Sequence, residues 1–323
     1  MENRLVVTAS PHIVDNSSTR KLMGNVVLAL LPCVIASALI FGARALLVIG
    51  VTTAACVGFE YLYTRLMKKP NPVGDLSAVI TGIILALNLP VSIPLWIAIV
   101  GAFISIVIAK QLFGGIGFNF VNPALVGRIV LFTGFAPRMT TWTYPAKSQE
   151  VLTSIDAVAS ATPLQAVDAN GTSLLSQYPL MDLFLGVHGG VLGETCALAI
   201  LIGFVCLLVT RTISAAIPVT YLATVAVISA LVGEPVLAQL LSGGLLFGAV
   251  FMATDYVTSP FTLKGKIVFG LGLGIITCGI RFWGNMAEGV SYAILFMNLL
   301  VPYINDLTRQ KPLGAKKKGA SKA

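Results

Sequence analysis

The chain is built from long apolar runs separated by short polar stretches. A transmembrane helix needs about 20 apolar residues to cross roughly 30 Å of hydrocarbon. Hydrophobic residues make up 56% of the 323 residues and charged residues only 11%, whereas roughly 25% of a soluble domain is charged. A soluble fold of this length needs far more polar surface, because a single core stops growing near about 250–300 residues. The composition therefore excludes a soluble enzyme, a nucleic-acid-binding module and a disordered chain, and it predicts an all-α polytopic membrane protein.

The apolar runs predict about ten transmembrane helices in the lipid bilayer. Five precede the longest polar stretch and five follow it: 24–41, 45–63, 76–89, 94–109, 121–136, then 190–209, 213–232, 236–253, 267–280 and 287–304. The runs at 76–89 and 267–280 are short for complete spans. We expect them to be broken helices, or to extend a few residues beyond these bounds.

Basic residues indicate the orientation, because Lys and Arg are retained on the cytoplasmic side of a membrane. With the N-terminus inside, sixteen basic residues fall on the cytoplasmic side, four fall outside, and Arg128 lies within a proposed span. Both termini are then cytoplasmic. The inner group comprises Arg4, Arg20, Lys21, Arg65, Lys68, Lys69, Lys110, Arg211, Lys264, Lys266 and six residues of the C-terminal tail.

The order of the runs predicts an internal duplication. An odd number of spans in each half inverts the second half relative to the first. The expected divisions are a cytoplasmic segment 1–23, a first five-helix half 24–136, an outer loop 137–189, a second five-helix half 190–304 and a basic tail 305–323.

The outer loop contains one run of small residues that draws attention to a hydroxyl group. The run starts at Asp156 and ends with Thr162, Pro163 and Leu164. Small side chains allow another group to approach the backbone, and the Thr162 hydroxyl is able to form an ester with a phosphate. From the residues alone, the same loop is equally typical of a solvated connector between two halves.

Ionisable side chains at membrane depth are costly and tend to pair or to have a function. Those near or within the proposed spans are Glu60, Arg128, Glu194, Asp255 and Glu288. Glu194 is expected in the first turn of its helix, where a carboxylate caps the positive end of the dipole, or in ion coupling or contact with a cofactor. Arg128 is expected to pair with a buried carboxylate inside the bundle, in preference to the phosphate of a cofactor.

Two further positions are candidates for lining a cavity. Asn122 and Pro123 resemble a helix start, with Asn as the cap and Pro at the first position. Asp255 follows an apolar run, so it either lines a cavity at a helix end or marks the exit to the cytoplasm. The five cysteines fall in apolar runs without a Cys-x-x-Cys pair, and the two histidines are far apart, so no metal site is expected.

Six stretches, in order along nearly the whole chain, resemble one family. That family is the D subunit of the Rnf electron-transport complex, which is related to the B subunit of the sodium-pumping NADH:quinone reductase. The stretches are 10–12 (SPH), 120–128 (FVNPALVGR), 192–195 (LGET), 252–260 (MATDYVTSP), 281–290 (RFWGNMAEGV) and 298–306 (NLLVPYIND). The short N-terminal part favours the Rnf subunit.

The resemblance implies that flavin mononucleotide (FMN) is joined through its phosphate to Thr162. In the family, the modified threonine ends a motif Asp-x-x-Ser/Thr-Gly-Ala-Thr. Here Asp156 lies six residues before Thr162 and Ala161 precedes it directly, but Ala159 and Ser160 depart from the pattern. Ser160 is an alternative ester site. The departures affect residues that the flavin-attaching enzyme must recognise.

The resemblance also implies the wider role of the chain. Electrons from reduced ferredoxin would pass through partner subunits to NAD+, coupled to export of Na+ or H+ across the bacterial inner membrane. A second flavin, riboflavin, would be held without a covalent bond in the membrane part. No catalytic residue is expected in this chain alone. The alternatives are a secondary transporter or channel for a small solute, and the B-type subunit of the quinone reductase.

Overall fold

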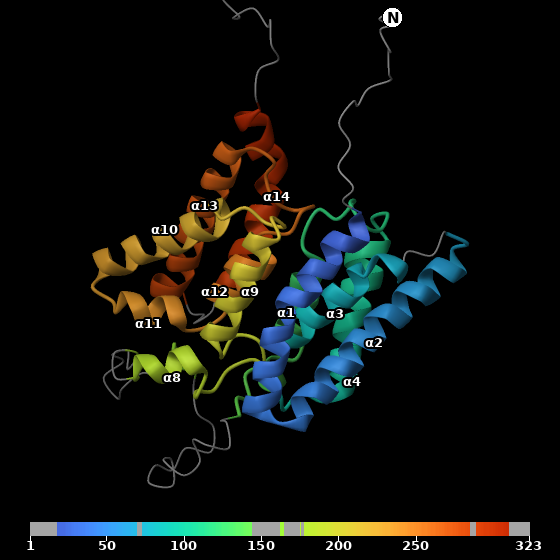
Figure 1. Ribbon diagram of the computed structural model, residues 1–323, viewed down its shortest axis with the longest axis horizontal. Helices are drawn as coiled ribbons and strands as arrows, with labels where there is room; N and C mark the ends of the chain where they lie inside the picture. The colour runs from blue at the N-terminus through green and yellow to red at the C-terminus, as the bar shows by residue number, and fades with distance from the viewer. Residues whose placement is uncertain are drawn as a thin grey trace, which may run out of the picture.

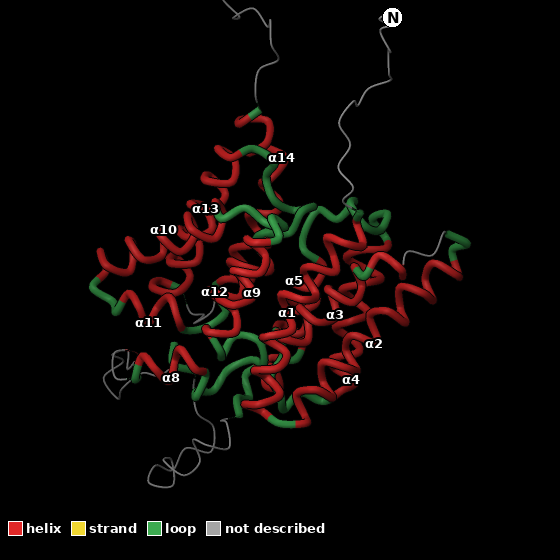
Figure 2. Tube along the Cα trace, viewed as in Figure 1, coloured by secondary structure: helices red, strands yellow, loops and turns green. Residues whose placement is uncertain are grey.

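The computed structural model describes residues 18–69, 73–143, 162–164, 175, 178–284 and 289–309. Within these ranges the chain forms helices joined by loops and contains no strand (Figures 1 and 2). The helices pack side by side into a bundle around an extended apolar core. The expectation of an all-helical fold is therefore confirmed for these ranges.

The part of the chain before the long polar segment contributes two long helices and several shorter ones. The elements are α1 (Thr19–Phe41), α2 (Ala43–Leu66), the 3₁₀ turn η1 (Val73–Asp75), α3 (Ser77–Leu87), α4 (Leu95–Phe103), the π-helix η2 (Ile104–Gln111), α5 (Pro123–Gly134) and α6 (Ala136–Met139).

The later part begins with a short helix and ends with two long ones. Its elements are α8 (Leu180–Leu185), α9 (Ala197–Val209), α10 (Ala216–Val232), α11 (Val236–Leu241), α12 (Leu245–Phe247), the π-helix η5 (Gly248–Met252), α13 (Leu263–Trp283) and α14 (Val290–Thr308).

Four of the described helices, α1, α2, α13 and α14, are long and apolar enough to cross a membrane, and five shorter apolar helices accompany them. The structure decides the continuity of two expected runs: the first is wrong as a single helix, and for the second the expected extension by a few residues is confirmed. The run 236–253 is not one helix, because it breaks after α11, where Gly243 adopts φ +66° in the left-handed region that glycine tolerates. The run 267–280 belongs to the uninterrupted α13, which starts earlier because the Thr262 side chain caps it by accepting from Gly265 N.

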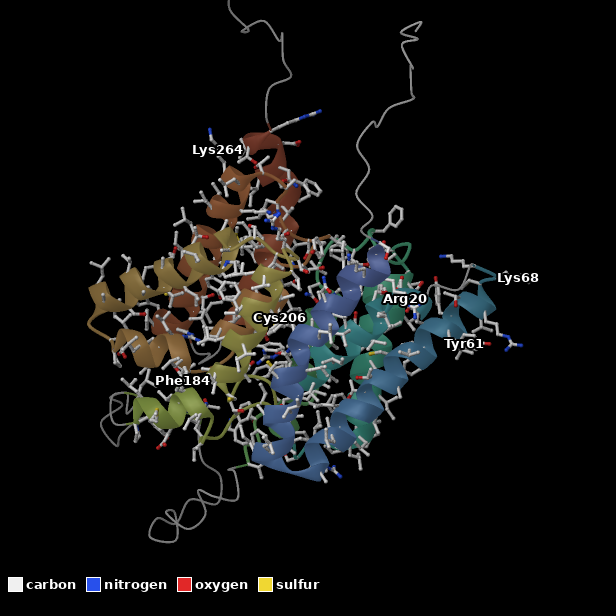
Figure 3. All side chains as sticks on the ribbon, viewed as in Figure 1. Arg20, Tyr61, Lys68, Phe184, Cys206 and Lys264 are labelled. Atoms are coloured by element: carbon white, nitrogen blue, oxygen red, sulfur yellow. The ribbon has the colours of Figure 1, made fainter. Side chains whose placement is uncertain are left out.

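Helices from the earlier and the later part of the chain lie against each other. Helix α1 packs along α9, and α5 packs beside α14. Close approach of α1 and α9 depends on Gly203, because a Cβ there would meet the Ala29 carbonyl oxygen. The start of α1, the loop with Lys68, the start of α13 with Lys264 and the end of α14 share one end of the bundle, which we call the terminal end (Figure 3). Helix α8 lies at the opposite end.

Candidate functional site

The loop between α8 and α9 enters the interior of the bundle. Gly193 N donates to the Leu87 carbonyl at 2.7 Å and Leu192 N to the Leu89 carbonyl at 3.1 Å. The Ser37 hydroxyl donates to the Leu192 carbonyl at 2.6 Å. The loop therefore takes over carbonyl groups that the end of α3 leaves unpaired. The span expected at 190–209 is helical only from Ala197 onward.

This loop places Glu194 against Arg128 of α5. Arg128 Nη1 lies 2.8 Å from Glu194 Oε1, and both side chains are buried. The same guanidinium nitrogen donates to Asn88 Oδ1 at 2.6 Å, at the end of α3. The expected pairing of Arg128 inside the bundle is confirmed. The expected place of Glu194 in a first helical turn is wrong, because α9 begins after its cap at Cys196 and Glu194 belongs to the entering loop.

Asn122 is the helix cap that the sequence predicted. Its side-chain oxygen accepts from Ala124 N at 3.1 Å, and Pro123 occupies the first helical position of α5. Its amide nitrogen donates to the Met252 carbonyl at 3.4 Å. Asn122 thus joins the start of α5 to the end of η5, two segments 130 residues apart in the chain.

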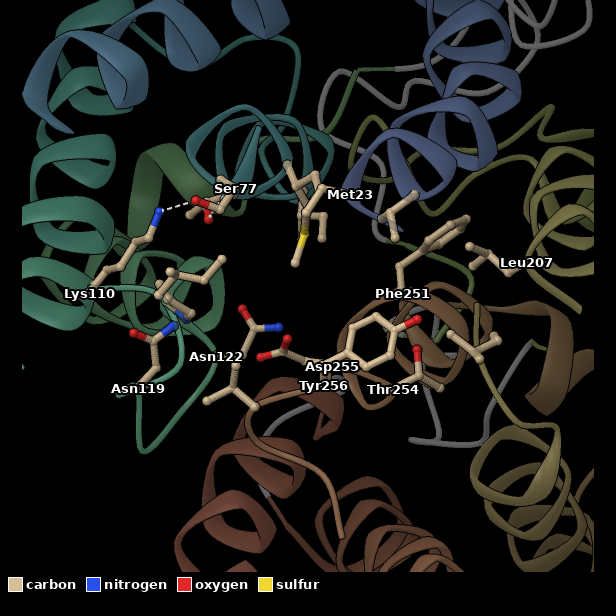
Figure 4. A pocket seen from close by; sticks show the side chains of 18 of the residues that line it. Met23, Ser77, Lys110, Asn119, Asn122, Leu207, Phe251, Thr254, Asp255 and Tyr256 are labelled. Atoms are coloured by element: carbon tan, nitrogen blue, oxygen red, sulfur yellow. Dashed lines mark hydrogen bonds between the residues drawn. The ribbon is translucent and has the colours of Figure 1, made fainter. Parts of the chain in front are cut away.

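Asn122 and Asp255 line one cavity near the terminal end, between the two parts of the bundle (Figure 4). The cavity has a volume of about 90 Å³. Asp255 follows η5 and accepts from the Thr258 hydroxyl at 3.1 Å. Of the two expectations for Asp255, the structure supports the cavity-lining one. The wall combines polar and apolar side chains, among them Met23, Ser77, Lys110, Asn119, Phe251 and Thr254.

Lys110 is the residue in this wall whose burial was not predicted from the sequence. It was predicted only to lie on the cytoplasmic side, and in the structure its side chain is 2% exposed with its Nζ 2.6 Å from Glu60 Oε1. Lys110 also donates to the Ser77 hydroxyl at 2.6 Å, and Gln111 Nε2 donates to Glu60 Oε1 at 2.7 Å. The sequence does contain a signal for this pairing: Lys110 directly follows the apolar run 94–109, and Glu60 lies inside the run 45–63.

Of the proposed flavin-attachment motif, the structure describes only Thr162, while Asp156, Ser160 and Ala161 lie outside the described residues. Thr162 is half-buried and is followed by the buried Pro163. Leu164 packs on a small apolar cluster of Leu175, Leu183 of α8 and Ala238 of α11. Thr162 is therefore two residues from an anchored side chain near α8. Glu288, the remaining membrane-depth carboxylate, is outside the described residues as well.

Long apolar helices, charged pairs buried between them and a polar cavity at the junction of two helical groups define a polytopic helical membrane protein with a polar interior. Among such proteins, the chain belongs to the NQR2, RnfD, RnfE family, whose family model matches residues 6–314.

Relatives match along almost their whole length. The chain is 42% identical to the D subunit of the Na+-translocating ferredoxin:NAD+ oxidoreductase complex of Acetobacterium woodii, covering 98% of this chain and 97% of that protein. It is 37% identical to the D subunit of the proton-translocating ferredoxin:NAD+ oxidoreductase complex of Clostridium ljungdahlii, covering 98% of each. It is 33% identical to the D subunit of the ion-translocating oxidoreductase complex of Actinobacillus succinogenes, covering 95% of this chain and 97% of that protein.

Proposed function

We propose that this chain is the D subunit of an ion-translocating ferredoxin:NAD+ oxidoreductase complex in the bacterial inner membrane. The observation that carries the proposal is the match to D subunits of such complexes over nearly the full length of both chains. The partners of this chain are then the other subunits of that complex. Electron transfer is completed by the assembly, and this chain supplies one membrane-embedded part of it.

The transported cation is Na+ or H+. Similar identity to a relative named for Na+ and to one named for protons leaves both open. Both names agree on a monovalent cation. The candidate groups for contact with it are the buried carboxylates Glu60 and Glu194 and the half-buried Asp255 of the cavity wall, because a positive charge inside a membrane needs a compensating negative one.

The proposed topology places the terminal end in the cytoplasm and the Thr162 loop outside. Arg20, Lys68 and Lys264 gather at the terminal end, and α8 with its attached cluster lies at the other (Figure 3). We also propose that the two parts of the bundle are an inverted five-helix repeat. The packing of α1 along α9 and of α5 beside α14 supports this, because a two-fold axis brings equivalent helices together.

The chain carries FMN on Thr162 in this proposal. A half-buried hydroxyl is accessible to an attaching enzyme, and Leu164 fixes the chain two residues away, so the described residues fit a tethered cofactor. When bound, FMN supplies a ring that takes up and gives off electrons singly or in pairs. The protein's part is to hold the hydroxyl near α8 and α11 while Pro163 keeps the backbone before it extended.

A second, non-covalent flavin, riboflavin, is also proposed for the membrane part, with no residues of this chain assigned to it. The cavity lined by Asn122 and Asp255 has a volume of about 90 Å³, whereas ligand pockets typically hold about 300–1,000 Å³. This cavity therefore does not fit a flavin ring, and it suits water and a small cation instead.

Attachment is tested by co-expressing the chain with the flavin transferase and examining the denatured band for fluorescence under ultraviolet light. The wild-type band is expected to fluoresce, Ser160→Ala to fluoresce and Thr162→Ala to stay dark. Mass spectrometry of the peptide containing Thr162 should show the added nucleotide. A dark wild-type band contradicts the flavin proposal and favours a plain transporter, whereas a dark Ser160→Ala band with a fluorescent Thr162→Ala band moves the ester to Ser160.

A further inference from the structure

The Glu60–Lys110 pair is buried where charges are expensive. Glu60 on α2 is fully buried and Lys110 at the end of η2 nearly so, with 2.6 Å between Nζ and Oε1. Desolvating two charges often costs more than their attraction returns, and an apolar pair of similar volume is frequently as stable or more so. Packing alone therefore gives no advantage to a charged pair at this place.

The oxygen atoms around the Lys110 ammonium resemble the surroundings of a bound monovalent cation. Nζ contacts Glu60 Oε1 and the Ser77 hydroxyl, and that hydroxyl in turn donates to Asp75 Oδ1 at 2.5 Å. Glu60 Oε2 is buried, and within the described residues it has no hydrogen-bond partner. One carboxylate oxygen is thus available to a further positive charge.

Two backbone irregularities build this arrangement. The π-helix η2 is wound more widely than an α-helix, and its last two residues, Lys110 and Gln111, both reach Glu60 Oε1. Leu76 has φ +66°, in the left-handed region that is unfavourable for a branched side chain. This turn sets Ser77 at the start of α3, with both its N–H and its hydroxyl on Asp75. Such strain is typical of functional sites.

The ammonium group lies between the cavity and the carboxylate. Ser77 and Lys110 line the cavity, as Figure 4 shows for both, whereas Glu60 does not. The titratable groups that face the pair are Asp75 of η1, through Ser77, and the Cys56 thiol, which lies one turn before Glu60 on α2. A cation in the cavity therefore reaches Glu60 only past Lys110.

We propose that Glu60 binds one monovalent cation during ion transport and that the Lys110 ammonium occupies this place between transport events. For H+, the ammonium passes its proton to Glu60, which leaves a neutral amine beside a neutral acid; after Glu60 has released that proton, the amine takes another from water in the cavity. For Na+, the ammonium releases its proton to water in the cavity and Na+ takes the place on Glu60. In both loaded states the net charge of the pair, with its cation, is zero. The inference rests on the proposed function, since it assigns a residue pair to that transport.

The test uses the complete complex reconstituted in liposomes, with reduced ferredoxin and NAD+ supplied and cation uptake followed together with NADH formation. In Glu60→Gln/Lys110→Met, NADH formation is expected to persist while cation uptake is lost. The matched control is Tyr221→Phe/Thr277→Val, which removes a buried neutral hydrogen bond of 2.6 Å in the later part of the bundle and is expected to leave the cations moved per NADH unchanged. Selective collapse of the gradient by a sodium ionophore or by a protonophore distinguishes Na+ from H+.

Wild-type uptake per NADH in the Glu60/Lys110 double variant overturns the inference and leaves the proposed function intact. A wild-type complex that neither forms NADH nor moves cations contradicts the proposed function instead. If the double variant does not assemble, the inference is tested by infrared difference spectroscopy. Spectra of the complex are recorded between its oxidised and reduced states, in NaCl and in KCl. We expect a carboxyl or carboxylate band that Glu60→Asp shifts; spectra in which Glu60→Asp shifts no band overturn the inference.

Discussion

Among the described residues, two buried ion pairs use different cations and connect different parts of the chain. Arg128 of α5 joins Glu194 of the entering loop and Asn88 of α3, so it links segments from both parts of the bundle. Lys110 and Glu60 belong to the earlier part alone. A guanidinium stays charged in proteins and holds two acceptors in fixed geometry, whereas an ammonium is compact and loses its proton more readily when buried. The Arg128–Glu194 pair therefore suits a permanent connection between the two parts, and the Lys110–Glu60 pair suits exchange of one cation for another.

The largest expected effect comes from breaking the permanent connection. Arg128→Met leaves Glu194 buried without its cation, which we expect to cost about 3–5 kcal/mol of unfolding free energy. Thermal unfolding in detergent and the yield of assembled complex measure this loss. Lys110→Met is expected to cost less, because the Gln111 side chain still donates to Glu60 Oε1. Equal losses in the two variants would remove the distinction between the pairs.

Acidification tests the loop that carries Glu194 without changing any residue. Burial lowers the pKa of His188 to about 4, below its ordinary value of 6.5, and Asp182 nearby opposes the shift. Between these two pH values His188 binds a proton in the unfolded chain but not in the folded one. The free energy of unfolding therefore decreases as the pH falls from 6.5 toward 4. The loss reaches roughly 3 kcal/mol at about 1.36 kcal/mol per pH unit. Chemical unfolding between about pH 7 and pH 4.5 measures it, and His188→Gln should flatten that part of the profile.

A smaller effect is expected where the entering loop touches α3. In Gly193→Ala, the new Cβ would meet Leu87 Cβ at 2.6 Å and the Leu87 carbonyl oxygen at 3.0 Å. Overpacking of this kind costs typically about 1–3 kcal/mol. Gly50→Ala is the control, because its Cβ would meet nothing within 4 Å and the site is helical. If Gly193→Ala unfolds at the same temperature as the control, the loop is not held tightly against α3.

The smallest expected effect tests a neutral buried contact against the two charged ones. Tyr221 and Thr277 share a hydrogen bond of 2.6 Å between α10 and α13. Tyr221→Phe is expected to lower the unfolding free energy by about 0.5–1.5 kcal/mol, the net value of one such bond. The thermal midpoint measures it, with Tyr303→Phe on an exposed position of α14 as the control. A loss as large as that of Arg128→Met would show that charge is not what sets the ion pairs apart.

Particular residues show where prediction from sequence succeeds. Asn122 before Pro123 was predicted as a helix cap, because capping depends on a few neighbouring residues, and the structure confirms it. Arg128 was predicted to pair inside the bundle from the cost of a charge in hydrocarbon, and it does. The flavin site at Thr162 stays a prediction, with most of its motif outside the described residues.

Composition, hydropathy and motifs are enough to establish that the chain is helical and apolar enough for a membrane, which charged residues lie near or within its apolar runs, and to which family it belongs. The packing of the helices is needed to show that Glu194 sits in an entering loop, that the run 236–253 breaks at Gly243 and that Lys110 is buried against Glu60. The reason is physical: hydropathy and caps act within a few residues, whereas the partner of a buried charge comes from a helix 50 or more residues away and is fixed by packing.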